Sequence, residues 1–408
     1  MAAGLLGIIA SSIASLAAPS TLMEIFVFII IVLSLNIEYG WTGIPNFGKI
    51  AFVSLGGLAA AIILNYVIIP SLAAMGEAHQ LPPGLEKHAL AIAEALKQGL
   101  TPGSYDYTLV FVNHVVPLLQ AMPHIYVVWL LASIGLAILL GIGFALLTSY
   151  TVVKLREDYL AIALLMGAFF LWVIYMNIPQ LIGGTFGIVL PLDSMLRGVL
   201  GPAEVEWRVV ILGVAALLAF IVAELLTNSP FGRVMRAVRD DEAAAEAMGK
   251  NVARVRLSVL LVSSVWAALG GVLYVTMYTG SLHPDNYKPE ITFWWIAMML
   301  LGGVGNNIGA IVGVVAFEVI YRIISGVTAS FVGGGFQGAI LNLMVGLIII
   351  IVMFVRPRGL IPEKAVATPL WSVYEERFGE KPGYATPWWE RLARLVKGRR
   401  GKRSSRVG

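Results

Sequence analysis

The chain has 408 residues, of which 58% are hydrophobic and only 13% are charged, and its mean hydropathy is +0.84. A soluble domain carries roughly 25% charged residues, so this composition excludes an ordinary soluble protein. Because the chain has no cysteine, disulfides and thiolate metal sites are excluded, and the five scattered histidines show no metal-ligand spacing. We expect an all-α polytopic integral membrane protein that binds no metal or cofactor.

Apolar runs divide the chain into candidate membrane spans. A bilayer core roughly 30 Å thick requires about 20 apolar residues per helix. Ten runs predict about ten transmembrane helices, some of them broken at glycines: 4–18, 22–37, 50–70, 125–149, 159–178, 207–227, 257–279, 291–306, 308–324 and 336–355. The first two are short, and only glycines separate the eighth from the ninth. Residues 1–18 lack the basic stretch of a cleavable signal, so we expect them to form a retained span.

The distribution of Lys and Arg predicts the orientation. An even number of spans places both termini on one side, which holds 22 of the 28 Lys and Arg residues, Lys49 among them. The opposite loops, at 71–124, 193–206 and 280–290, hold only four. Short cytoplasmic loops are rich in Lys and Arg, so we expect both termini in the cytoplasm.

Two regions lie outside the predicted spans: a long insertion and a basic C-terminal tail. The membrane domain is expected to cover 1–355, with an extracytoplasmic insertion at 71–124 that contains a short amphipathic helix at 84–99. The basic cytoplasmic tail, 356–408, is rich in tryptophan and arginine. Its pattern is typical of an amphipathic helix on anionic membrane lipid, which we favour over nucleic-acid binding.

A polar, charged segment at 229–249 lies between two apolar runs. Pro230 suits a first helical turn and Gly249 suits a helix stop, so the pattern predicts one continuous helix. Such a helix cannot lie in hydrocarbon and must project from the membrane body. A solvated connector is the alternative. The length of the cytoplasmic coupling segment, 228–256, and the small, charged face of its helix favour docking into a groove on another protein.

Glycine-rich stretches raise the question of a solute pathway. Residues 43–49 match the spacing of a phosphate-binding loop, but Ile50 stands where that loop needs Ser or Thr, so nucleotide binding is disfavoured. Broken backbone at membrane depth is tolerated where it is buried in protein or lines a cavity, so both readings stay open here. Glycines at 183–184 offer backbone N–H groups to a solute carboxylate, with an external turn as the alternative. The candidate pathway residues are Gly43, Asn46, Gly183, Gly184, Thr185 and Asn306.

Two further features lie at the start of the ninth predicted span and within it. Gly305, Gly309 and Gly313 recur every four residues, a spacing that favours close helix packing. The neighbouring Asn306 either caps the helix or offers its amide to a solute. Glu318 is the clearest ionisable residue inside a span; because Arg322 lies one turn later, an ion pair is favoured over a proton relay.

The charged segment, SPFGRVMRAVRDDEAAAEAMGKNVARVRL, resembles the cytoplasmic segment of LivM-type permeases, the membrane subunits of ATP-driven importers for branched-chain amino acids. Other stretches resemble that family in the same order: NIEYGWTGIPNFGKIAFVSLGGLAAA, LREDYLAIALLMGAFF, GGTFG, MLLGGVGNNIGAIVGVVAFEVI and MFVRPRGLIP. Three features depart from the family pattern. Lys49 stands where many members have histidine, Phe186 stands where a small polar residue is common, and the 71–124 insertion is long.

The resemblance implies a permease in the cytoplasmic membrane of a prokaryote. It implies a second, homologous permease, two cytoplasmic ATPase subunits that bind the ATP, and an extracytoplasmic solute-binding protein as partners. It also implies that the charged helix docks into an ATPase groove, and the residues carried over to this coupling role are Arg233, Arg236, Asp240, Glu242, Glu246 and Gly249.

Two alternatives come from different functional classes. A secondary transporter or channel for small polar solutes, urea and short amides included, would act without an ATPase and would predict intramembrane relays and internal repeats. A membrane-embedded enzyme is disfavoured, because the spans hold no cluster of His, Asp and Glu and no catalytic residue is apparent. The solute and the identity of the second permease stay open.

Overall fold

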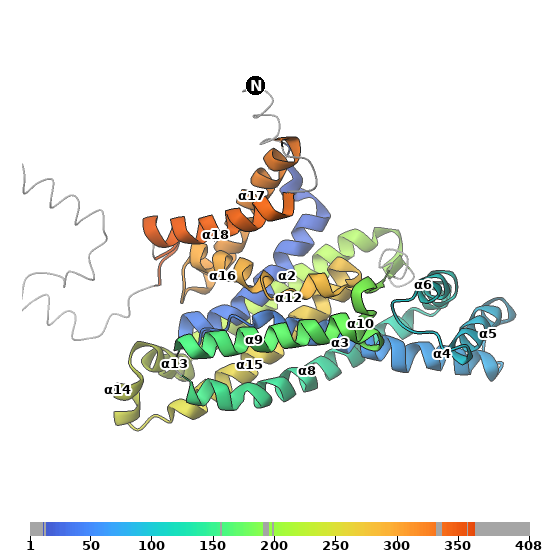
Figure 1. The fold of residues 1–408 in the computed structure, drawn as a ribbon, viewed down its shortest axis with the longest axis horizontal. Helices are drawn as coiled ribbons and strands as arrows, with labels where there is room; N and C mark the ends of the chain where they lie inside the picture. The colour runs from blue at the N-terminus through green and yellow to red at the C-terminus, as the bar shows by residue number, and fades with distance from the viewer. Residues whose placement is uncertain are drawn as a thin grey trace, which may run out of the picture. The chain divides into compact units, whose positions relative to one another are not determined.

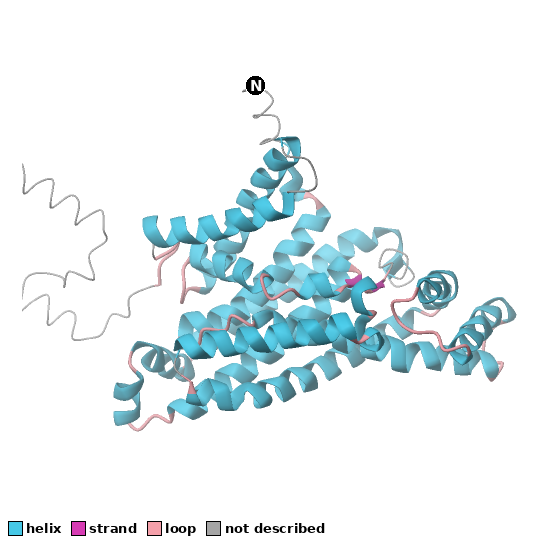
Figure 2. Ribbon diagram, viewed as in Figure 1, coloured by secondary structure: helices cyan, strands magenta, loops and turns pink. Residues whose placement is uncertain are grey.

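The computed structural model describes residue 11 and residues 14–363, apart from 156, 191–195, 198–199, 332–336 and 357. Helices make up nearly all of this part of the chain, and strands β1 (Ile188–Val189) and β2 (Ser281–Leu282) pair antiparallel (Figure 2). The predicted all-α polytopic class is therefore confirmed. The first predicted span and the amphipathic helix of the tail fall outside the described residues, save for a few positions of the span.

Seven of the described helices are long and apolar enough to cross a membrane, and they match the second to seventh and the ninth predicted spans. They are built on α2 (Pro19–Leu35), α3 (Lys49–Ile63) with α4 (Ile69–Glu77), α8 (Pro123–Lys154), α9 (Glu157–Asn177), α12 (Glu204–Thr227), α15 (Val252–Leu273) and α17 (Asn307–Phe331). π-helical turns at Asn36–Gly40, Leu64–Ile68 and Tyr274–Thr279 extend α2, α3 and α15.

The tenth predicted span is α18 (Gln337–Val355), which has 19 residues. The eighth is α16 (Ile291–Gly302), which has 12 residues. A helix of that length rises only about 18 Å, so the prediction of a full span at 291–306 is wrong. Gly303 has a φ of 129° and ends the helix early.

The centre of the bundle is a close crossing of α3, α8 and α15. A Cβ on Gly271 would lie 1.9 Å from the carbonyl oxygen of Val53, and one on Gly56 would lie 2.0 Å from that of Ala268. Only glycine permits this approach of two helix backbones. Trp129 of α8 joins the crossing by donating from Nε1 to a carbonyl oxygen of α3 at 2.9 Å.

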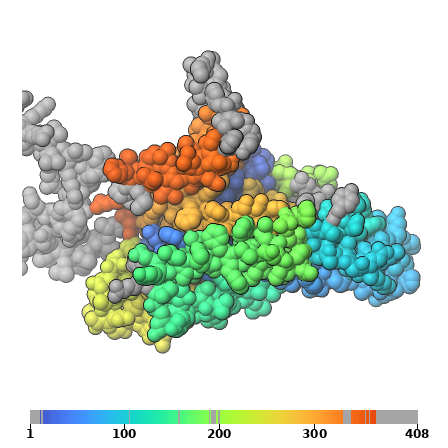
Figure 3. All heavy atoms as spheres, in the orientation of Figure 1, coloured from blue at the N-terminus to red at the C-terminus, as the bar shows by residue number. Residues whose placement is uncertain are grey.

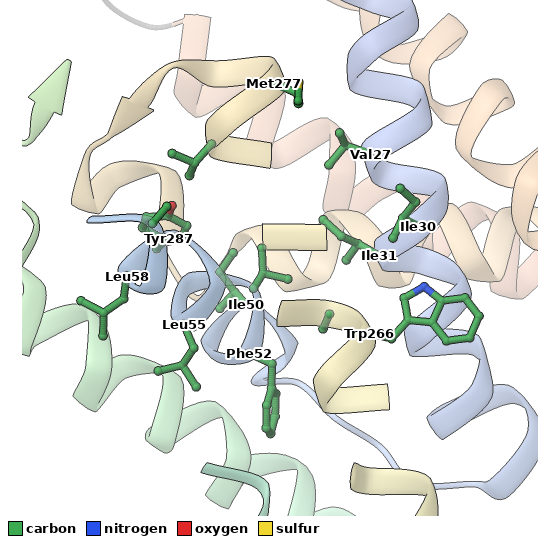
Figure 4. Packing of buried hydrophobic residues seen from close by; sticks show 14 of the residues in the cluster. Val27, Ile30, Ile31, Ile50, Phe52, Leu55, Leu58, Trp266, Met277 and Tyr287 are labelled. Atoms are coloured by element: carbon green, nitrogen blue, oxygen red, sulfur yellow. The ribbon is translucent and has the colours of Figure 1, made fainter. Parts of the chain in front are cut away.

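α2 lies on the other side of α15 and is deeply buried for most of its length. Ile30 and Ile31 of α2 approach Gly270 of α15, where an added Cβ would lie 3.1 Å from Ile31. Figure 4 shows these side chains together with Phe52 of α3 and Trp266 of α15 in one continuous apolar core. By contrast, α8, α9 and α12 expose many apolar side chains, and Figure 3 shows α8 and α9 along one face. Apolar surface of this extent is suited to lipid or to another subunit.

α16 and α17 form a tight hairpin. A Cβ on Gly302 would lie 1.9 Å from the carbonyl oxygen of Gly309, and one on Gly313 would lie 2.0 Å from that of Met298. The segment after α18 returns to this hairpin, because Leu360 and Ile361 donate backbone hydrogen bonds to the carbonyls of Leu301 and Gly302. The compact unit that contains this hairpin ends at Pro362.

The two ends of the bundle carry different elements (Figure 1). One end carries α4, α5 (Pro83–Lys97), α6 (Tyr105–Val110) and α7 (Val116–Ala121), which form the insertion and include the predicted amphipathic helix. The other end carries α13 (Pro230–Asp240) and α14 (Glu242–Ala247). Within the insertion, the Nδ1 atoms of His88 and His114 lie 3.1 Å apart. The fold thus pairs two histidines that are well separated in the sequence, while the described residues hold no cluster of three or more His, Cys, Asp or Glu suited to a metal.

Candidate functional site

The projecting segment consists of two helices. The prediction of one continuous helix is wrong, because Asp241 adopts an extended conformation with φ −160° and ψ 107°. Its carboxylate accepts a hydrogen bond from the backbone N–H of Ala244 at 3.0 Å and thereby caps α14. Ser229 caps α13 in the same way through the N–H of Gly232. Gly249 has a φ of +76°, the left-handed conformation of a helix stop.

The inner face of the segment is fixed to the membrane bundle. A Cβ on Gly232 would lie 2.1 Å from the carbonyl oxygen of Thr227, so α13 turns tightly off the end of α12. Glu242 forms an ion pair with the buried Arg256 of α15, and Arg256 also donates to the carbonyl of Val152 in α8. Glu242 therefore has a structural partner within the chain, although the resemblance assigned it to an ATPase contact.

Two arginines of α13 contact the turn that follows α2. The guanidinium of Arg236 lies 4.9 Å from the ring centroid of Trp41, a cation–π contact. Arg239 donates from Nη1 to the carbonyl oxygen of Gly40 at 2.6 Å. Gly43, with a φ of +75°, lies against the same side chain, and a Cβ there would approach Arg239 Cγ to 3.2 Å. The first turn after α2 is thus directly attached to the projecting segment.

The outer face of the segment is free of such attachments. Arg233, Asp240, Glu246 and Gly249 are exposed, as the assignment to a docking role requires. Beside them Met248 has 80% of its surface exposed. Sequence reasoning missed Met248; the available signal was a large apolar residue directly before the helix-stop glycine of a polar helix.

A buried ion pair lies close to the turn that Arg236 and Arg239 contact. Lys49 Nζ donates to Glu38 Oε2 at 2.8 Å, and both side chains are fully buried. Lys49 also donates to the carbonyl oxygen of Ser263 in α15, and Asn46 donates to Glu38 at 3.1 Å. Lys49, counted above with the cytoplasmic Lys and Arg residues, is therefore a buried cation, and Glu38, an acid inside an apolar span, was overlooked.

Asn307, the first residue of α17, links that helix to the end of α2 and to α12. Its Oδ1 accepts hydrogen bonds from Asn36 Nδ2 at 3.1 Å and from Trp41 Nε1 at 3.2 Å. Its Nδ2 donates to Glu224 and to Thr227, both at the end of α12. Trp41, which Arg236 contacts, is therefore connected through the side-chain amide of Asn307 to α2, α12 and α17.

The predicted pathway residues do not come together. Asn46 and Gly43 lie near the end of the bundle that carries α13, whereas 183–185 follow α9 at the opposite end. Gly183 has a φ of +86° and packs against Gly103 and Gly187. Asn306 Oδ1 accepts from the N–H of Gly309, as a helix cap does, and its Nδ2 donates to Pro362. Contact of these residues with a solute stays a prediction.

The comparisons with known proteins agree on one family. The family model described as the permease component of a branched-chain amino acid transport system matches residues 18–353. The chain is 30% identical over 348 residues to the probable branched-chain amino acid transport permease protein LivM of Methanocaldococcus jannaschii, covering 84% of this chain and 92% of that one. It is 25% identical over 261 residues to the high-affinity branched-chain amino acid permease protein LivM of Salmonella typhimurium, and 24% identical over 261 residues to that of Escherichia coli, covering 59% of each chain. No solved structure matches.

Proposed function

Because the chain belongs to the family of permease components of branched-chain amino acid transport systems, we propose that it is the membrane subunit of an importer driven by ATP-binding cassette subunits. Its substrates are branched-chain amino acids or related small amino acids. The chain is a multi-pass membrane transport protein, and in the proposed assembly it holds no catalytic residue and no cofactor, since ATP is bound by the partner ATPases.

The projecting segment α13–α14 is the observation that carries this proposal. Its outer face joins exposed charges to the exposed side chain of Met248. An apolar side chain surrounded by charged residues suits a groove with an apolar floor and a polar rim. A transporter that worked alone would have no use for such a face, whereas a permease that receives force from a soluble motor needs one.

The attachments of α13 supply a route by which force from the ATPase would reach the membrane bundle. Arg239 holds the carbonyl of Gly40, and Arg236 holds the ring of Trp41. Displacement of α13 would therefore move the turn after α2 and, through Asn307, the start of α17. Arginine suits this role because its planar guanidinium keeps its contacts in a fixed orientation.

The remaining assignments follow from the same proposal. A second, homologous permease would complete the membrane unit, and an extracytoplasmic solute-binding protein would deliver the amino acid to the end that carries the 71–124 insertion. The Lys and Arg distribution supports a cytoplasmic position for α13, α14 and both termini, in a prokaryotic plasma or inner membrane as the family resemblance implies. The basic tail would contact anionic lipid on that side.

Reconstitution tests the proposal. Proteoliposomes that contain this chain, its second permease and the ATPases should take up radiolabelled leucine only when ATP is enclosed with the ATPases and the loaded binding protein is outside. Uptake by the permeases alone, without ATP, would contradict the proposal and favour a secondary transporter or channel. Glu246→Arg should release the ATPases during purification, whereas Lys97→Glu, an exposed change on the insertion, should retain them.

A further inference from the structure

A second group of charged side chains lies within the membrane bundle, far from the coupling segment in the sequence and in the fold. Arg322 of α17 donates from Nη2 to Glu24 of α2 at 2.7 Å. Its Nε lies 3.5 Å from Oε2 of Glu318, one turn earlier on the same helix. Two carboxylates thus share one guanidinium, and the group connects α2 to α17.

The hydrogen bonding of this group is incomplete. Glu318 is 2% exposed, yet its Oε2 has no hydrogen-bond partner among the described residues, and the same holds for Nε of Arg322. A buried carboxylate oxygen and a guanidinium N–H that face one another without a hydrogen bond are unfavourable. The group therefore retains one acceptor and one donor for a polar ligand.

Aromatic rings border the charged group. The rings of Trp294 and Tyr321 lie 5.1 Å apart, and Tyr321 is in the turn that also carries Arg322. On the α15 side, Tyr278 lies near the carboxylate of Glu24. Aromatic faces beside carboxylates suit an ammonium group and an apolar side chain together.

The position of the group in the membrane decides what it faces. Glu24 and Arg322 keep 21% and 23% of their side-chain surface exposed, and both belong to helices long enough to span a bilayer. A charged residue inside hydrocarbon costs roughly 2.5–3.5 kcal/mol even on the mildest scale. The exposed parts of the Glu24 and Arg322 side chains are therefore expected to face water or protein and not lipid chains.

We propose that Glu24, Glu318 and Arg322 form a binding site for the zwitterionic head group of an α-amino acid on its way through the membrane. The guanidinium of Arg322 binds the carboxylate in a forked arrangement, and the two glutamates bind the ammonium group. The rings of Trp294 and Tyr321 contact the apolar side chain. Because a zwitterion replaces each internal ion-pair contact with an equivalent one, it enters without leaving a buried charge unpaired.

This site rests on the proposed function, and ligand chemistry tests it. The complete transporter in nanodiscs, without the binding protein, is titrated with leucine, with leucinamide, which lacks the carboxylate, and with 4-methylpentanoate, which lacks the ammonium group. Saturation-transfer NMR of the methyl groups reports binding. Leucine should bind at least tenfold more tightly than either analogue.

Single variants then distinguish a role in ligand binding from a purely structural role of these charged residues. Arg322→Gln should abolish the preference for leucine over leucinamide, and Glu24→Gln should reduce the preference over 4-methylpentanoate. Arg322→Lys, which keeps the charge but loses the fork, should show an intermediate preference even if Arg322→Gln fails to fold. Lys97→Gln on the insertion serves as the control and should keep both preferences.

Two results would overturn the proposal: equal affinity of the wild type for the three ligands, or variants that weaken all three by the same factor. The same wild-type sample is then given solute-loaded binding protein, and its ATP hydrolysis is measured. Stimulated hydrolysis without ligand preference overturns this site alone, whereas no stimulation overturns the proposed function and the site with it.

Discussion

Lys49 and Glu38 form a fully buried ion pair, with Nζ and Oε2 separated by 2.8 Å, directly behind the turn that Arg239 of the projecting segment holds. The pair connects the π-helical end of α2 to the start of α3, and Lys49 extends the connection to α15 through the carbonyl of Ser263. Three helices that meet near the coupling segment thus share one pair of charges.

Removal of one member of this pair should strongly destabilise the protein. Lys49→Met leaves the Glu38 carboxylate buried without its cation, and such a loss typically costs about 3–5 kcal/mol. Thermal unfolding of the purified transporter should show the decrease. The double variant Lys49→Met/Glu38→Leu should recover part of this loss, because no charge is left unpaired. A double variant that is no more stable than Lys49→Met would contradict this account.

The helix crossing of α3 and α15 should not tolerate a methyl group at Gly271. Gly271→Ala would place Cβ 1.9 Å from the carbonyl of Val53, and forcing extra volume into a packed core costs about 1–3 kcal/mol. Gly135→Ala on α8 is the matched control, since an added Cβ there has no atom within 4 Å. We expect the control to gain about 0.5–1 kcal/mol of helix stability. Equal stabilities for the two variants would count against the close crossing of α3 and α15.

The cap of α14 should depend on the Asp241 side chain. Asp241→Ala removes the acceptor for the N–H of Ala244 and should lower local stability by about 1 kcal/mol. Hydrogen exchange of the amides at 242–247 should then become faster. Asp240→Ala, one residue earlier and exposed, leaves the cap in place and should not change these rates; acceleration in both variants would refute the capping role.

Acidification should destabilise the 71–124 insertion. Desolvation and the neighbouring His88 lower the pKa of His114 below its usual value. The unfolded insertion therefore takes up a proton more readily than the folded one. The stability of the insertion decreases as the pH falls from about 6.5, the ordinary pKa of histidine, to the lowered pKa of His114 in the folded state. Limited proteolysis within 83–121 should become faster as the pH is lowered from 7.5 to 5. His114→Gln should reduce this pH dependence.

The sequence predicted the helical class, most of the spans, and the amphipathic helix 84–99 of the insertion, because long apolar runs and amphipathic patterns are local signals. It did not predict the break at Asp241, since a capping aspartate and a helical aspartate look alike inside an alanine-rich run. It likewise missed the Glu38–Lys49 pair and the Glu24–Arg322 contact, because both depend on how the helices pack. Gly309 and Gly313 had the right spacing for close packing, but only the fold shows that α16 is the neighbour.

The most direct test of the central claim is the accessibility of residue 248 to a thiol reagent. Since the chain has no cysteine, Met248→Cys gives a single thiol at the most exposed apolar point of the coupling segment. Its rate of maleimide labelling should fall at least tenfold when the ATPases are bound, whereas Gln98→Cys on the insertion should label at the same rate with and without them. An unchanged rate at position 248 in the assembled complex would contradict docking of the ATPase on α13–α14.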